Sequence, residues 1–167
     1  YNNLMYVAAG LAVEKAAGKP WEEYVREKFL VPLGMSSTNF RIEETKKAAN
    51  HAKPHLLADG KLEEIPFFNL DAMCPAGGIN SSANDLARWL KFQLGNGKLD
   101  DKTILPKKQL GEMHTGYSVV VPLPIRAVTE EYTVQSTYGL GWTIADYRGH
   151  KIVHHGGSID GFTSFIL

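Results

Sequence analysis

Two short segments of the sequence carry side chains that could exchange protons or bind a substrate. Tyr1 and Asn3 stand two positions apart at the start of the chain, and the string from His155 to Ser158 reads His-Gly-Gly-Ser. A phenol titrates near pH 10, so Tyr1 could act as a base near neutrality only beside a positive charge. Gly157 has no side chain, so the backbone there can lie flat against a substrate.

Each segment also has a purely structural interpretation. Asparagine is a favoured N-cap residue, so Asn3 could simply cap the helix that follows. Glycines are common at strand bends, so the histidine and its two glycines could form a bulge beside an ordinary surface histidine. His154 directly precedes His155, which leaves open which of the two imidazoles matters.

The residue pattern disfavours a metal or thiol site. Cys74 is the only cysteine, which excludes an internal disulfide and a Cys-rich zinc site and favours a small buried hydrophobe. A proline separates His51 from His55. His150 and His154 could share a strand face, but without a carboxylate or a third histidine. We therefore expect no metal and no cofactor.

A third segment, Pro75 to Leu86, reads P-A-G-G-I-N-S-S-A-N-D-L, and Pro32 to Met35 reads P-L-G-M. With Y-x-N at 1–3 and H-G-G-S-I-D-G-F at 155–162, this ordered set resembles the penicillin-recognising serine hydrolases. The resemblance is closest to class C beta-lactamases, low-molecular-weight penicillin-binding proteins, and related esterases and D-aminopeptidases. It covers almost the whole chain. Placing Gly161 on the family's string selects His155 over His154.

The resemblance implies a role for each matching residue. Tyr1 would pass a proton between the nucleophile and the leaving group, and Asn3 would hydrogen-bond an amide or carbonyl of the substrate. The backbone N–H of Ser158 would form one half of an oxyanion hole, and such a donor is worth roughly 3 kcal/mol in the transition state.

The string from His155 through Gly156 to Gly157 matches the family's H-x-G motif, which stands where other members have K-T-G. Lysine is a permanent cation that would attract a substrate carboxylate, whereas histidine is mostly neutral at pH 7. This departure favours an esterase or peptidase over an efficient beta-lactamase.

The family's nucleophile motif, S-x-x-K, is not found at any serine of the sequence. In the family this motif precedes Y-x-N, so we expect the nucleophile in an upstream, N-terminal segment of the same domain. The chain would then be the distal part of a serine hydrolase that cleaves an ester, peptide or beta-lactam through an acyl-enzyme. The alternative is a non-catalytic relative that binds a peptide or cell-wall ligand in the same groove.

The elements that must position these residues follow from periodicity and turn signals. Helices are predicted at 3–17, at 21–29, from the N-cap Ser82 to the glycines after residue 94, and at 106–114. Asp85 would complete a capping box with Ser82. Residues 40–76 are expected to be a long loop with a short strand within 61–67, and residues 119–124 an extended loop. Strands are predicted at 138–144, 151–155 and 161–167.

Helices that precede an antiparallel sheet predict an α+β fold. The resemblance implies that this fold is beta-lactamase/transpeptidase-like and that the 167 residues contain only part of it. We expect residues 1–135 to be mainly helix and loop and residues 136–167 to form the sheet. The many small residues of the first helix predict a central helix that is covered on most sides.

Composition limits the partners. The 167 residues carry 18 Lys+Arg and 18 Asp+Glu, and zero net charge argues against nucleic acid. We expect a small-molecule or peptide substrate, the missing N-terminal segment as a partner, and self-association through exposed strand edges. By resemblance, the parent protein would be periplasmic, extracellular or membrane-associated in a bacterium.

Overall fold

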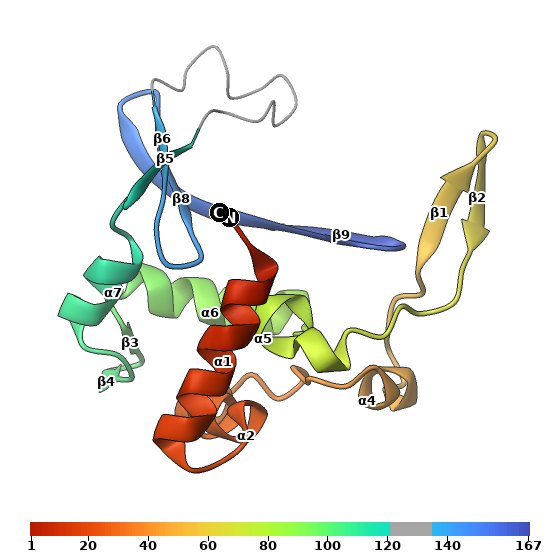
Figure 1. The fold of residues 1–167 in the computed structure, drawn as a ribbon, viewed down its shortest axis with the longest axis horizontal. Helices are drawn as coiled ribbons and strands as arrows, with labels where there is room; N and C mark the ends of the chain where they lie inside the picture. Colours follow the sequence, from red (N-terminus) through yellow and green to blue (C-terminus); the bar gives the residue numbers. More distant parts are fainter. Residues whose placement is uncertain (121–134) are drawn as a thin grey trace. The chain divides into compact units, whose positions relative to one another are not determined.

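The computed structural model describes residues 1–120 and 135–167, and it has the predicted α+β fold (Figure 1). Of the extended loop expected at 119–124, residues 119 and 120 instead belong to strand β5 (Ser118–Val120), and residues 121–124 lie outside the described residues. The described part of the chain forms two compact units, residues 1–92 with 158–162 and residues 93–157 with 163–167. Neither unit contains a described helix that is long and apolar enough to cross a membrane.

Helix α1 (Asn3–Ala17) opens unit 1 with the predicted bounds. It ends at Gly18, which adopts the left-handed conformation with φ 67° that glycine tolerates best. The expectation that α1 is covered on most sides is not met within the described residues, because Gly10 is its only buried residue. Leu4, Met5 and Leu11 are each at least 60% exposed.

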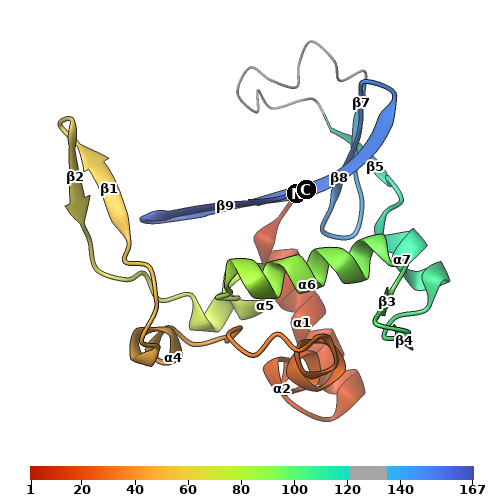
Figure 2. The ribbon, with the colours of Figure 1, turned by 180° about the vertical axis from the view of Figure 1, so that it is seen from behind.

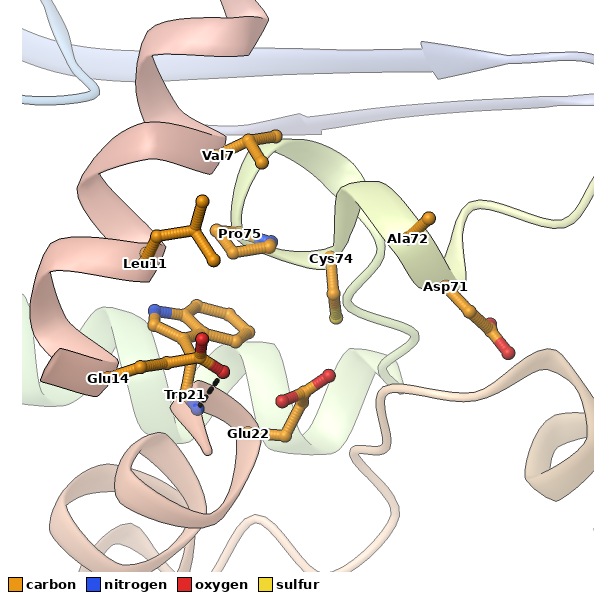
Figure 3. A pocket seen from close by; sticks show the side chains of 10 residues that line it. Val7, Leu11, Glu14, Trp21, Glu22, Asp71, Ala72, Cys74 and Pro75 are labelled. Atoms are coloured by element: carbon orange, nitrogen blue, oxygen red, sulfur yellow. Dashed lines mark hydrogen bonds between the residues drawn. The ribbon is translucent and has the colours of Figure 1, made fainter. Parts of the chain in front are cut away.

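The surroundings of Gly10 explain why this position of α1 requires a residue without a side chain. A Cβ built there would lie 2.7 Å from Cβ of Pro75, the second residue of α5 (Cys74–Gly77). The backbones of α1 and α5 therefore approach closely at this point. A cavity of about 100 Å³ lies beside the contact, with Leu11 and Trp21 on its wall (Figure 3). The backbone N–H of Trp21 donates to Oε1 of Glu14 at 3.0 Å.

The second predicted helix is longer than expected and is irregular. It consists of α2 (Trp21–Val25), a π-helical turn η1 (Arg26–Leu30) and α3 (Val31–Leu33). Pro32 has no N–H to donate to a carbonyl one turn back, and the π turn, in which Val31 N–H donates to the Arg26 carbonyl, widens the helix just before it. Gly34, with φ 66°, ends the helix.

The expected loop at 40–76 contains more structure than predicted. It holds α4 (Ile42–Lys47), the hairpin β1 (His55–Ala58) and β2 (Lys61–Glu64), the 3-10 turn η2 (Asp71–Met73) and then α5. The strand predicted within 61–67 is confirmed as β2, but its partner β1 was missed. Leu57 and Leu62 face each other across the hairpin and are at least 70% exposed.

Helix α6 (Ala83–Leu94) begins at the predicted N-cap, since the Asp85 N–H donates to Oγ of Ser82 at 3.2 Å. The Asp85 carboxylate is not used for a capping box. It is buried and accepts from the Ser37 N–H at 2.9 Å and the Thr38 hydroxyl at 2.7 Å. Asp85 therefore does not act as a local cap but connects the start of α6 to residues 37–38, which precede α4.

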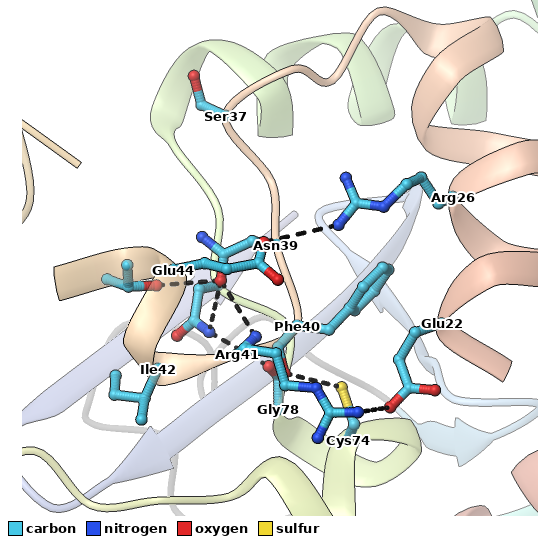
Figure 4. A network of polar contacts seen from close by, with 12 residues as sticks. Glu22, Arg26, Ser37, Asn39, Phe40, Arg41, Ile42, Glu44, Cys74 and Gly78 are labelled. Carbon is cyan, nitrogen blue, oxygen red and sulfur yellow. Dashed lines mark hydrogen bonds and ion pairs between the residues drawn. The ribbon is translucent and has the colours of Figure 1, made fainter. Parts of the chain in front are cut away.

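The same two stretches of chain are joined a second time. Asn39 and Asn80 exchange backbone hydrogen bonds of 2.9 Å in both directions, and the Cys74 thiol lies 3.8 Å from the Phe40 carbonyl (Figure 4). Arg41 extends from this network to Glu22 at 3.2 Å. The segments that carried the resemblance, 32–35 and 75–86, thus flank one structural network. The buried hydrophobic side chains described in unit 1 are Leu30, Leu33, Met35, Phe40, Ile42, Cys74 and Phe92.

Unit 2 contains the short strands β3 (Lys98–Leu99) and β4 (Lys102–Thr103), helix α7 (Lys107–Met113) and most of a five-stranded antiparallel sheet. The sheet order is β5-β6-β7-β8-β9. Its strands are β5 (Ser118–Val120), β6 (Ser136–Tyr138), β7 (Thr143–Tyr147), β8 (His150–Ile159) and β9 (Phe162–Ile166).

The strand predicted at 138–144 is instead the end of β6, a turn and the start of β7. Gly139 N–H donates to the Trp142 carbonyl at 2.8 Å, and Gly141 has a φ of 84°, so the chain reverses there. A second reversal at Arg148 and Gly149, with φ 52° and 77°, joins β7 to β8 (Figure 2).

Candidate active site

The first group of predicted site residues lies at the start of α1. The Tyr1 hydroxyl donates to Oδ1 of Asn3 at 2.6 Å. Asn2, not Asn3, is the N-cap of the helix, since its Oδ1 accepts from the Leu4 N–H at 2.8 Å. The capping interpretation of Asn3 is therefore wrong, and its side chain is oriented toward the Tyr1 hydroxyl.

The electrostatics of Tyr1 favour the neutral phenol. The covered part of its side chain raises its pKa, and the nearby Tyr6, whose ring centroid is 6.0 Å away, adds to the rise. A phenol with a raised pKa is protonated near pH 7 and can donate, which agrees with its hydrogen bond to Asn3. It would need an adjacent positive charge to act as a base.

The second group lies on β8. The pairing between β7 and β8 begins at His150 and ends at His154, which faces Thr143. Strand β8 continues to Ile159, so the stretch 155–159 has no described β7 residue opposite it. The string from His155 to Ser158 thus lies inside a strand that extends past one of its neighbours, and not in the connection between two strands.

The structure separates the two neighbouring histidines. His154 is buried, its ring lies 5.2 Å from that of Phe165, and burial together with the proximity of His155 lowers its pKa. His155 is half-buried, and its Nε2 lies 3.4 Å from the hydroxyl of Tyr138. His155, the residue that the motif selected, is therefore the more accessible imidazole.

Successive side chains of a strand point to opposite faces, so His155 and Gly157 share one face and His154 and Gly156 the other. The neighbouring strand β9 agrees with this alternation. A Cβ built on Gly157 would lie 2.6 Å from Oγ of Ser164, whereas one built on Gly156 would lie 3.7 Å from the Phe165 ring.

The structure thus brings the predicted residues together in two groups, Tyr1 with Asn3 in unit 1 and His155 with Gly157 in unit 2. Ser158 follows Gly157 on β8 and is exposed. Two further side chains adjoin the second group. Tyr138 contacts His155, and Ser164 lies beside Gly157. Neither could be found from the sequence without the register of the strands.

The other titratable groups have structural surroundings. Nδ1 of His51 lies 2.7 Å from the Ala48 carbonyl, and Nδ1 of His55 lies 2.9 Å from that of Lys53. Burial raises the pKa of Cys74 to about 12, so its thiol is un-ionised at neutral pH. In residues 1–120 and 135–167, no group of three or more His, Cys, Asp or Glu side chains is arranged to hold a metal ion.

Comparison with known proteins agrees with this architecture. A sequence model of the family described as Beta-lactamase matches residues 1–167. Unguisins hydrolase ungD' of Aspergillus campestris is 31% identical over 168 residues, which are 97% of this chain and 29% of that protein.

Two solved structures extend the likeness to three dimensions. The octameric penicillin-binding protein homologue of Pyrococcus abyssi is 32% identical with a TM-score of 0.81, over 99% of this chain and 34% of that one. The D-amino acid amidase of Ochrobactrum anthropi, complexed with L-phenylalanine amide, is 25% identical with a TM-score of 0.68, over 98% of this chain and 44% of that one. The chain therefore spans less than half the length of each of these relatives.

Proposed function

Because the chain belongs to the beta-lactamase family of serine hydrolases, we propose that it supplies the proton-transfer and oxyanion side of an acyl-enzyme site. The observation that carries this proposal is the stretch of β8 from His155 to Ile159. It extends past β7 and presents the H-x-G motif on an edge that a substrate can approach.

The nucleophile in this proposal is a serine that lies outside the chain, with a lysine three residues after it. The serine hydroxyl proton moves to the Tyr1 phenolate as Oγ bonds to the acyl carbon. The bond from that carbon to the leaving nitrogen or oxygen then breaks, and Tyr1 returns the proton to the leaving group. Water hydrolyses the acyl-enzyme by the same proton path. The lysine ammonium would offset the raised pKa of Tyr1.

The remaining residues hold the substrate. Asn3 would donate its side-chain amide to a substrate carbonyl, and the N–H of Ser158 would stabilise the oxyanion together with the N–H of the nucleophile. The stretch of β8 that extends past β7 suits an extended, peptide-like substrate, because such a chain can add to it as a strand. Relatives described as a hydrolase and as a D-amino acid amidase support an amide of an amino acid or short peptide as the substrate class, with esters next.

Covalent labelling tests this proposal. In the full-length protein that contains these residues, a fluorophosphonate probe should label one serine, and that serine should lie upstream of Tyr1. Tyr1→Phe keeps the ring but removes the proton carrier, so labelling and the hydrolysis of phenylalanine amide should slow by about 10²–10⁴-fold. The matched control is Tyr6→Phe, which removes the hydroxyl of the neighbouring tyrosine, on α1, and should change both rates less than about threefold.

Three outcomes would overturn the proposal. The first is labelling of any of the serines within residues 1–167. The second is a Tyr1→Phe variant as reactive as the Tyr6→Phe control. The third is a full-length protein that binds phenylalanine amide and never hydrolyses it, which would favour the non-catalytic binding protein.

A further inference from the structure

Ser164 occupies a distinctive place beside the H-x-G motif. It lies on β9, and its Oγ is 2.6 Å from the point where a Cβ of Gly157 would stand. By the alternation along β8, His155 points to the same face as Gly157. One face of the sheet therefore carries an imidazole, a stretch of bare backbone and a hydroxyl side by side.

The Ser164 hydroxyl is available to a ligand. The side chain is exposed, and it has no hydrogen-bond partner among the residues at 1–120 and 135–167. Had the hydroxyl been needed to join β9 to β8, it would be bonded to one of them. A hydroxyl that lies next to the backbone of a glycine, and that makes no hydrogen bond to any described residue, is well placed to bond a ligand that lies on that backbone.

We propose that Ser164 is a specificity-determining residue that donates a hydrogen bond to an acceptor oxygen of the substrate. The oxygen belongs to a carbonyl or carboxylate one residue away from the scissile bond, in a group that leans across Gly157. This inference rests on the proposed function, because it takes His155 and Gly157 as the substrate-facing part of β8. It adds a substrate contact that the motifs do not contain.

The chemistry follows from the geometry. A hydroxyl can donate to a carbonyl or a carboxylate, and a substrate that lacks such an oxygen loses nothing when the hydroxyl is removed. The glycine is part of the same arrangement, since a Cβ at 157 would lie only 2.6 Å from Oγ of Ser164 and would displace that hydroxyl. Ser164 should thus affect the choice of substrate and not the acylation step itself.

The test compares three amides in the full-length protein. N-acetylphenylalanine amide has an acceptor oxygen on the acyl side, phenylalanyl-glycine has a carboxylate on the leaving side, and 3-phenylpropionamide has neither. Ser164→Ala should lower kcat/KM about tenfold for at least one of the first two, mainly through KM, and should leave 3-phenylpropionamide unchanged within about twofold. The matched control is Thr163→Ala, which removes an exposed hydroxyl from the opposite face of the same strand and should affect none of the three.

An equal loss on all three amides, or no loss on any, would overturn the proposal. Failure of the proposed function is distinguishable, because the wild-type protein would then hydrolyse none of the amides. Calorimetric titration with phenylalanyl-glycine and N-acetylphenylalanine amide would still decide the role of Ser164. Weaker binding in Ser164→Ala than in Thr163→Ala would support it, and equal binding or no binding would refute it.

Discussion

At the scale of single residues, two adjacent asparagines have different tasks. The Asn2 side chain accepts from the Leu4 N–H and begins α1, whereas the Asn3 side chain accepts from the Tyr1 hydroxyl. The first interaction stabilises a helix terminus, and the second orients a titratable group. The two neighbouring positions therefore have different local roles, a helix cap at Asn2 and a contact with the Tyr1 phenol at Asn3.

We expect Asn2→Ala to lower the free energy of unfolding by about 1 kcal/mol, because a helix N–H loses its acceptor. Its rate of amide hydrolysis should stay near that of the wild type. Asn3→Ala should show the opposite pattern, with stability within about 0.5 kcal/mol of wild type and a markedly lower kcat/KM. Urea denaturation and hydrolysis of phenylalanine amide measure the two effects. A variant pair with the effects reversed would show that Asn3 is the structural residue.

The sequence predicted the candidate site residues by type and order, and it could not settle their local roles. Two consecutive asparagines are equally good cap candidates in the sequence, and the structure distinguishes them by the extended backbone of Asn2, with φ −152°, and by the hydrogen bond that its side chain accepts from the Leu4 N–H. The sequence also cannot decide between His154 and His155, because the alternation of a strand buries one of two neighbouring side chains but does not show which one. Ser164 was missed because its proximity to Gly157 depends on the register of two strands.

At the scale of elements, close packing of helix backbones limits one position of α1. Gly10 faces Pro75 of α5, and a Cβ there would overlap the proline ring. Gly111 is also inside a helix, α7, but apart from its chain neighbours and the backbone of its own helix, no atom of the described residues lies within 4 Å of its Cβ position. The two glycines look alike in the sequence and differ in their surroundings.

Alanine substitution should separate these two glycines. Gly10→Ala should destabilise the protein by about 1–3 kcal/mol, because the rigid ring of Pro75 must shift. Gly111→Ala should stabilise it by about 0.5–1 kcal/mol, because alanine has the higher helix propensity and meets no obstacle. Thermal or urea unfolding of both variants gives the sign directly. A stabilised Gly10→Ala would mean that α1 and α5 do not pack as closely as described.

Helices were predictable from periodicity, and interrupted strands were not. The bounds of α1 match the prediction because its caps, Asn2 and Gly18, are local signals. Strand β1 was missed because its sequence, H-L-L-A, has no polar–apolar alternation and most of its residues are exposed, although Asp59 and Gly60, both at positive φ, form the kind of turn that joins hairpins. Asp85 was misassigned because its partners, Ser37 and Thr38, are distant in sequence.

At the scale of the whole molecule, the chain matches the beta-lactamase family over residues 1–167 and spans less than half the length of its relatives. Large apolar side chains are exposed on α1 and on the hairpin β1–β2, among them Leu4, Leu11, Leu57 and Leu62. We propose that the remaining part of the domain supplies the nucleophile.

The edge of the sheet gives the prediction at this scale. Strand β9 is last in the order of the described strands, and its sequence, F-T-S-F-I, contains no charged residue or proline to discourage pairing. Residues 1–167 expressed alone should therefore self-associate as their concentration rises. Thr163→Lys places a charge on the exposed edge strand and should reduce the association, whereas Thr163→Ala keeps the strand neutral and should not. Sedimentation velocity measures the species present. A chain that stays monomeric at every concentration, or that associates equally in both variants, would show that self-association does not occur through the edge of β9.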